Sequence, residues 1–186
     1  MLDSVLVARD KFLKKEGILL PSHCTIFSAP CSLRDLKRST FDFWLNVYGF
    51  DMTPMANEAL KRSKPEITLV KPDQILADKA QVFELDLKNA QASDLSTIKS
   101  RHFLSIKRTD QFQGLAIWFK VEFNNAFAEN WTSISLDTSP SSQPTHWKQT
   151  VVPLFQLGNE EEVEEDEIVG WELKLSREKN SRQYSL

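Results

Sequence analysis

Residues 112–123 read FQGLAIWFKVEF, and this stretch decides the fold class. Within it, five apolar residues recur at every second position, namely Leu115, Ile117, Phe119, Val121 and Phe123. A period of two places these side chains on one face of a half-buried β-strand. We therefore predict one long strand here, which requires partner strands from elsewhere in the chain.

Short strand-like segments separated by turn residues fill the chain from residue 66 onward. The alternation is clear again in Val169, Trp171, Leu173 and Leu175. The predicted strands are 66–70, 81–87, 102–109, 112–123, 131–137, 147–154, 168–175 and 182–186, with a further one at 25–29. Many short strands at regular spacing are typical of a barrel or a sandwich. We predict a mainly β fold, a β-barrel or barrel-like sandwich, over residues 22–186.

The first 21 residues follow a different pattern. Apolar residues at helical spacing predict an amphipathic helix over residues 2–14, which Gly17 would end. Residues 18–20 are all apolar and precede Pro21, which predicts a short buried strand. A helix followed by a buried strand is typical of an α/β domain. We therefore predict that residues 1–21 are the last helix and strand of such a domain, joined to the β domain.

Residues 33–62 are helix-like and rich in aromatic side chains, and they are too apolar for a linker. Two interpretations stay open from the residues alone. Either the segment is part of the core of this chain, or it is an arm that buries its aromatic side chains in a partner subunit.

The composition excludes several function classes. The chain has 186 residues, of which 41% are hydrophobic and 12 are Phe, which fits a folded domain and not a disordered chain. Its five glycines are isolated, so neither G-x-G-x-x-G nor the P-loop pattern occurs. The net charge of −3 includes seven acids within residues 160–167. We interpret this run as a solvated loop, the alternative being a docking segment for a basic partner.

The sequence contains no signal for a metal, a nucleic acid or a membrane. Cys24 and Cys31 lack zinc spacing and have no His placed to complete a site. No basic stripe with interleaved aromatic residues indicates nucleic-acid binding, and no apolar run approaches the ~20 residues of a membrane span. Two cysteines in a chain of this size favour a reducing compartment, so we expect a location in the cytoplasm, the nucleus or both.

The most informative segment for chemistry is THWKQT at residues 145–150. A His beside a Trp at the start of a strand is a candidate site, because His146 can hold a carboxylate in place or move a proton near neutral pH. The π face of Trp147 can form one wall of a pocket for a cation. The alternative is a partly buried His–Trp pair without a chemical role.

Four segments form an ordered set of motifs: MLDSVLVARDK at residues 1–11, GILLP at 17–21, FWLNVYGFDM at 43–52 and THWKQ at 145–149. In this order they resemble motifs of the protein arginine N-methyltransferases. The first resembles the helix after that family's double-glutamate hairpin, and the second the strand and proline that end its cofactor domain. The third resembles its dimerisation arm, and the fourth resembles its THW loop. Residues 136–140 are similar to the segment that leads into that loop in the family.

The resemblance implies methyl transfer from S-adenosylmethionine to the guanidinium of arginine side chains in proteins, such as histones or Arg-Gly-rich proteins. In the family, two glutamates grip the guanidinium and the barrel contributes the THW loop. On the matching positions, His146 would pair with an acid of the cofactor domain, Trp147 would line the arginine pocket and Thr145 would set the loop. Met1 would match the family's active-site methionine.

The resemblance also implies that residues 33–62 form an arm that reaches a second subunit and closes a dimer. The arm residues expected in this contact are Phe41, Phe43, Trp44, Tyr48 and Phe50. Because an unpaired arm would leave apolar surface exposed, we expect the isolated chain to self-associate.

The family's glycine-rich cofactor loop and its two glutamates have no counterpart in this sequence. We therefore expect this chain alone to bind no S-adenosylmethionine and to be inactive. One hypothesis is that it is the C-terminal part of a longer, active methyltransferase that forms a homodimer, because Met1 matches a position inside a helix of the family. The other is a non-catalytic barrel that forms a heterodimer with a full-length relative and regulates it.

Overall fold

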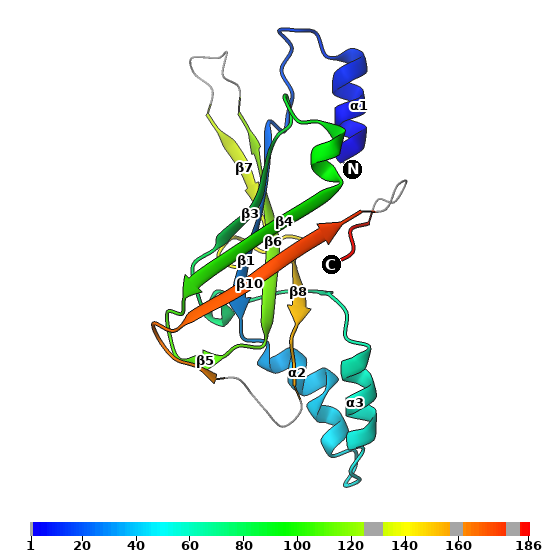
Figure 1. Cartoon of the computed structure of the whole chain (residues 1–186), viewed down its shortest axis with the longest axis vertical. Coiled ribbons are helices and arrows are strands. Elements are labelled where there is room, and N and C mark those ends of the chain that lie inside the picture. Colours follow the sequence, from blue (N-terminus) through cyan, green and yellow to red (C-terminus); the bar gives the residue numbers. More distant parts are fainter. Residues whose placement is uncertain (1, 125–131, 157–161, 178–182) are drawn as a thin grey trace.

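The computed structural model describes residues 2–124, 132–156, 162–177 and 183–186. The α-helices lie at the two ends of the molecule, and strands fill its middle (Figure 1). The helical elements are α1 (Leu2–Phe12), α2 (Arg34–Thr40), η1 (Asp42–Leu45), α3 (Thr53–Lys61), η2 (Pro72–Gln74) and η3 (Ala92–Leu95). The strands are β1 (His23–Cys31), β2 (Glu66–Thr68), β3 (Ala80–Asp86), β4 (Thr97–Ser105), β5 (Asp110–Gln111), β6 (Gly114–Phe123), β7 (Ile134–Asp137), β8 (Gln149–Pro153), β9 (Glu162–Val163) and β10 (Ile168–Ser176). The chain is mainly β, as the alternating residues predict.

The predicted long strand is β6, and it lies in a six-stranded sheet ordered β2-β8-β6-β1-β3, with β7 also paired to β6. Lys120 of β6 lies opposite Asp137 of β7, whereas Ile117 lies opposite Thr150 of β8. The strands β7 and β8 therefore follow one another along the same edge of β6. The chain between them must leave this edge and return to it, which creates the loop that carries His146.

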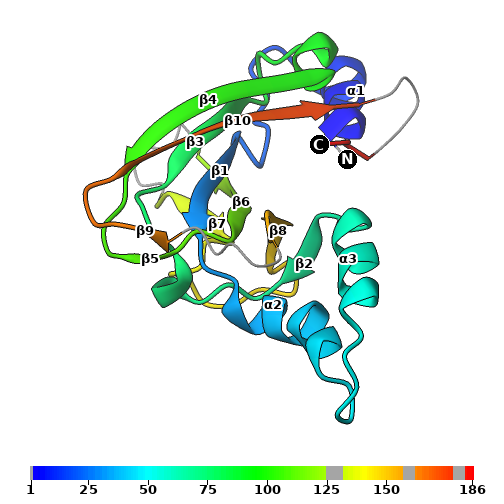
Figure 2. The same ribbon diagram turned by 60° about the horizontal axis from the view of Figure 1, so that its bottom comes forward.

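The strands β10 and β4 form a second, two-stranded sheet that crosses one face of the main sheet (Figure 2). A hydrophobic cluster that includes Leu115 and Leu173 fills the space between the two layers. Trp171 of β10 donates a hydrogen bond from Nε1 to Ser28 Oγ of β1 at 3.2 Å, which links the layers. The strands β5 and β9 form a short third sheet. In the described residues the strands thus make an open, barrel-like sandwich and not one closed barrel.

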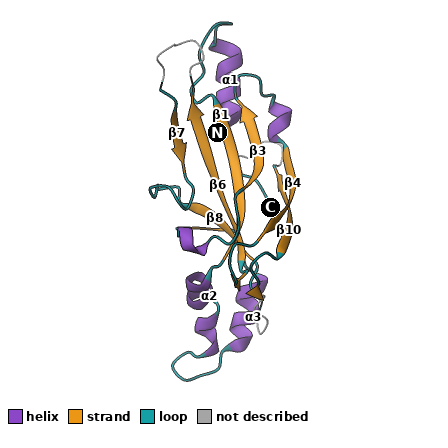
Figure 3. Ribbon diagram, turned by 90° about the vertical axis from the view of Figure 1, so that its left-hand side faces the viewer, coloured by secondary structure: helices purple, strands orange, loops and turns teal. Residues whose placement is uncertain are grey.

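The opposite face of the main sheet carries a second hydrophobic cluster, which extends to the start of α2. It includes Phe27, Trp118, Val151 and Leu33. The backbone N–H of Leu33 donates to Gln113 Oε1 at 2.7 Å, so the start of α2 is fixed to the residue that precedes β6. From there α2, η1 and α3 project away from the end of the molecule where α1 lies (Figure 3).

Two predicted strands are wrong, and the predicted helix is shorter than expected. The helix ends at Phe12 and not near residue 14. Residues 18–20 form no strand, and the side chains of Ile18 and Leu20 are exposed, because no described strand pairs with this segment. Of the strand predicted at 182–186, residue 182 lies outside the described residues, and residues 183–186 form only an isolated bridge between Ser185 and Ser176.

Parts of two other predictions lie outside the described residues. Residue 131 of the strand predicted at 131–137 is one of these, and the observed strand begins at Ile134. Residues 160 and 161 of the acidic run are also outside the described part. Within the rest of that run, Glu162 and Val163 form β9, and Glu164 to Glu167 are exposed.

Candidate functional site

The loop of residues 138–148, termed the THW loop below, carries the His146–Trp147 pair between β7 and β8. A turn closes at its end, because the backbone N–H of Lys148 donates to the carbonyl of Thr145 at 3.1 Å. Lys148 has a φ of 54°, a left-handed conformation that is uncommon for residues with a side chain. Lys148 thus joins the His146–Trp147 pair to β8, which begins at the next residue, Gln149.

Two buried polar side chains hold the ends of the THW loop together. Thr138 Oγ1 accepts from the N–H of Phe119 at 3.1 Å and donates to the carbonyl of Phe119 at 2.8 Å. Gln149 Nε2 donates to the Thr138 carbonyl at 2.8 Å, and Gln149 Oε1 accepts from the N–H of Val70 at 2.8 Å. Thr138 and Gln149 are 1% and 2% exposed. Because a buried polar group without a partner is costly, these contacts fix both ends of the loop.

The rings of His146 and Trp147 stack at the surface of the THW loop. Their centroids are 3.8 Å apart, and their planes are inclined by 35°. Trp147 also meets Phe119 of β6 in an edge-to-face contact with centroids 5.9 Å apart. His146 is exposed and Trp147 is 43% exposed. The pair is therefore open to solvent on one side, while Trp147 packs on Phe119 of β6 on another.

Two pockets lie beside this loop. One of about 560 Å³ is lined by residues of β7 and the THW loop, among them Asp137 and Thr145. Thr145 Oγ1 is buried and has no hydrogen-bond partner among the described residues. Asp137 also lines a second pocket of about 310 Å³, together with Trp118 and Ser139. Space for a bound group is thus present next to the loop.

The arm of residues 33–62 exposes apolar side chains at its tip. Phe43, Tyr48 and Phe50 are 51%, 96% and 72% exposed. Trp44 is partly buried and packs edge-to-face on Phe43, with ring centroids 5.3 Å apart. The tip therefore has the apolar surface expected of a segment that contacts another subunit.

Phe41 differs from the other aromatic residues of the arm, and its expected exposure is corrected by the structure. It is 2% exposed and packs edge-to-face against Phe155, with ring centroids 4.9 Å apart. Phe155 in turn packs on the cluster that includes Trp118. Phe41 therefore extends the core into the base of the arm and is not available to a partner.

The residues that support the site were not found from the sequence. Thr138, Gln149 and Phe119 hold the THW loop, and the only usable signal was a polar side chain at the end of each flanking strand. Met1 lies outside the described residues, so its role stays a prediction. In the described part of the chain, no group of three or more His, Cys, Asp or Glu could hold a metal ion. No described helix is long and apolar enough to cross a membrane.

Comparison with known proteins identifies a family. Residues 22–186 match the arginine methyltransferase oligomerization subdomain. The chain is 31% identical over 216 residues to the probable protein arginine N-methyltransferase 6 of Arabidopsis thaliana, and the match covers 99% of this chain and 49% of that protein. It is 32% identical over 180 residues to protein arginine N-methyltransferase 2 of Homo sapiens, over 95% of this chain and 41% of that protein.

A solved structure has the same fold. It is the Trypanosoma brucei PRMT1 enzyme-prozyme heterotetrameric complex with AdoHcy, for which the TM-score is 0.81 at 26% identity, over 98% of this chain and 54% of that chain. The present chain spans about half the length of the relatives it matches. It belongs to the arginine methyltransferase family and carries that family's C-terminal oligomerization subdomain.

Proposed function

We propose that this chain supplies one wall of the arginine pocket, and the dimer arm, of an enzyme that methylates arginine side chains of proteins. The observation that carries the proposal is the open His146–Trp147 pair on a loop whose ends are tied by buried hydrogen bonds. Such support keeps side chains in a fixed orientation, on which the rate of an enzyme depends strongly. Membership of the family supports the class of reaction.

The chemistry of the three loop residues fits an arginine substrate. A guanidinium group is planar, and it remains charged in proteins. Trp147 offers a ring face to such a cation. The imidazole of His146 can hold a carboxylate, and a carboxylate binds guanidinium through paired hydrogen bonds. In this scheme Trp147 binds the substrate, His146 orients an acidic residue from outside this chain, and Thr145 shapes the turn.

S-adenosylmethionine would supply the methyl group in the proposed reaction. The residues of this chain do not fit that cofactor, because its five glycines are isolated and form no glycine-rich loop. We therefore assign the cofactor site to another part of the enzyme or to another subunit. Calorimetry is expected to detect no binding of S-adenosylmethionine to the 186-residue chain, and measurable binding would contradict this assignment.

Methyl transfer by the protein that the complete gene encodes tests the role of the THW loop. We expect that protein to transfer label from S-adenosylmethionine to an Arg-Gly-rich peptide. Because they remove groups that orient the substrate, His146→Ala and Trp147→Ala should each lower kcat/KM by about 10- to 100-fold, with an unchanged circular dichroism spectrum. Lys174→Ala, at an exposed position of β10 that lines neither pocket, is the control and should keep the wild-type rate. Full activity in both loop variants would contradict the proposal.

A second candidate is a non-catalytic barrel that pairs with a full-length relative and regulates it. The apolar arm tip favours this second candidate. The tip consists of residues of this chain only, and the base of the arm is joined to the sheet by the hydrogen bond from Leu33 to Gln113. Light scattering after size exclusion, with and without the Arabidopsis relative, measures the association. A mixed complex together with an inactive complete gene product would support this candidate, whereas an active gene product would support the first.

A further inference from the structure

Helix α1 is fixed to the rest of the chain through one of its faces. Asp3, Leu6 and Arg9 follow one another at a spacing of three residues, which places them on one side of the helix. Each of the three contacts a segment that lies far along the sequence. The helix is therefore docked along its length and is not attached only through the chain that follows it.

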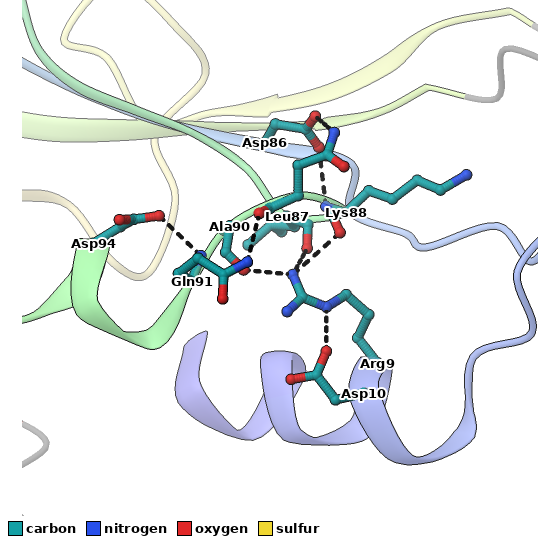
Figure 4. Close-up of polar contacts among 9 residues, drawn as sticks. Arg9, Asp10, Asp86, Leu87, Lys88, Ala90, Gln91 and Asp94 are labelled. Atoms are coloured by element: carbon teal, nitrogen blue, oxygen red, sulfur yellow. Dashed lines mark hydrogen bonds and ion pairs between the residues drawn. The ribbon is translucent and has the colours of Figure 1, made fainter.

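Arg9 makes the largest number of these polar contacts. Its Nη1 donates to the carbonyls of Leu87, Lys88 and Ala90 at 2.8, 3.2 and 2.7 Å (Figure 4). Its Nε donates to Asp10 Oδ1 at 2.8 Å on the same helix. The Arg9 side chain is only 10% exposed. Because a charged donor strengthens each hydrogen bond and burial shields it from water, these contacts hold α1 firmly.

The loop after β3, which receives Arg9, is shaped by hydrogen bonds of its own. Asp86 accepts from the N–H of Lys88 at 2.9 Å and from Asn89 Nδ2 at 2.6 Å. Asp94 accepts from the N–H of Gln91 at 2.8 Å, also seen in Figure 4. The three carbonyls are therefore held in place by contacts that do not involve Arg9, and the guanidinium docks on a preformed acceptor.

Two further contacts hold the same face of α1. Leu6 is 3% exposed and packs in a hydrophobic cluster with Leu85 and Leu87. Arg177 donates two hydrogen bonds to the Asp3 carboxylate, the one from Nη2 at 2.8 Å. The helix is thus held near its first turn, in its middle and near its last turn.

The loop that binds Arg9 and the THW loop both follow strands of the six-stranded sheet. The former follows β3, and β3 is connected through β1 and β6 to β7 by continuous hydrogen-bonded pairs. The helix is therefore connected, through the end of β3 and the hydrogen-bonded strands, to the strand that leads into the THW loop. Val7 and Phe12 of α1 remain 52% and 80% exposed, so another domain or subunit can pack on them.

We propose that Arg9 is a positioning residue that fixes α1 relative to the THW loop, so that a domain packed on the exposed side of α1 is aligned with the arginine pocket. The effect of this alignment on methyl transfer rests on the proposed function, whereas the placement of α1 is a property of this chain. In this role Arg9 acts through α1, because its hydrogen bonds join Asp10 of that helix to the loop after β3.

The distance between two spin labels measures this placement directly. Cysteines introduced at the exposed positions Val7 and Gln143 would carry the labels. Burial raises the pKa of the thiols of Cys24 and Cys31, so these react slowly, and the labelled wild-type chain serves as the check. Pulsed electron paramagnetic resonance is expected to give one narrow distance distribution when Arg9 is present.

Variants of Arg9 distinguish a fixed helix from a loosely attached one. Arg9→Met, which keeps the length of the side chain but removes every donor, should broaden the distribution while the circular dichroism of the strands persists. Arg9→Lys keeps the charge and three N–H donors and should restore part of the narrow distribution. Lys11→Met, on the same helix turn, is the matched control and should leave it narrow. An equally narrow distribution in Arg9→Met would overturn the inference.

The complete gene product gives an independent measurement. Arg9→Met is expected to lower kcat by about tenfold while the KM for S-adenosylmethionine stays nearly unchanged, because misalignment weakens the transition state and not cofactor binding. An inactive wild-type gene product would refute the proposed function, and the label distances would still decide the role of Arg9. In an active gene product, equal kcat values for wild type and Arg9→Met would refute the role in alignment.

Discussion

At Gly114, the first residue of β6, the strand leaves no room for a side chain. A Cβ there would lie 2.5 Å from the Val152 carbonyl oxygen and 2.9 Å from Leu33 Cδ1. Because the Val152 backbone belongs to the β6–β8 pairing, it cannot move without loss of hydrogen bonds. Gly114→Ala should therefore lower the free energy of unfolding by about 1–3 kcal/mol, as measured by urea denaturation.

Gly170 in β10 provides the matched comparison. A Cβ there would lie 2.6 Å from the ring of Phe103, but that ring is 66% exposed and can turn away. Gly170→Ala should therefore cost less than Gly114→Ala. If both variants lost the same free energy of unfolding, the backbone of β8 near Gly114 would yield to an added Cβ as easily as the exposed ring of Phe103 does, which would contradict this account.

The carboxylate of Asp86 makes the free energy of unfolding depend on pH in the acid range. Burial alone would raise its pKa, but hydrogen bonds from Asn89 and from the N–H of Lys88 outweigh burial, and the pKa is lowered. The stability that such a carboxylate contributes is complete above its unfolded pKa of about 3.9 and is lost as the pH falls through its lower folded pKa. Asp86→Asn should therefore be less stable than wild type at neutral pH, and the difference in urea midpoint should shrink in acid. A constant difference from neutral pH down to strongly acid pH would contradict this account.

At the scale of elements, Gln149 at the start of β8 joins the first residue of the THW loop, Thr138, to Val70 in the segment after β2. Gln149→Ala would leave the Val70 N–H and the Thr138 carbonyl buried without this partner. The variant should lose about 1–3 kcal/mol of stability, and amide hydrogen exchange in residues 138–148 should accelerate. Gln143→Ala, at an exposed position of the same loop, is the control. Unchanged exchange in Gln149→Ala would show that the loop is held by other contacts.

Which elements could be predicted depends on whether their signal is local. The strand β6 was predictable because its alternation is a property of the sequence itself. The strands β5 and β9, with two residues each, exist only by pairing with each other across the fold. Residues 18–20 have the composition of a buried strand, but a strand requires a partner, and Leu19 instead packs on the cluster beneath α1.

The candidate site was predictable to the same extent. The THW motif is local, so its position was found, whereas the supports of the loop were not. Gln149 meets Thr138 and Val70 only because the sheet brings three segments together. Phe41 cannot be told from the exposed aromatic residues of the arm by composition, since only its packing on Phe155 separates it from them.

At the scale of the whole molecule, the chain keeps two functional surfaces apart. The THW loop lies at the edge of β6, and the apolar tip of the arm lies beyond α2, at the end opposite α1 (Figure 1). An oligomerization subdomain explains why large aromatic side chains such as Tyr48 and Phe50 are left in solvent. In the absence of a partner, this surface should drive association of the chain with itself.

Sedimentation velocity over a range of concentrations tests this central claim most directly. The wild-type chain is expected to sediment as a dimer or larger species, and Phe50→Asp at the arm tip should shift it to a monomer. Phe103→Asp places the same charge at a position of similar exposure on β4, outside the arm, and should leave the association intact. A wild-type chain that stays monomeric at high concentration, or equal loss of association in both variants, would contradict the account.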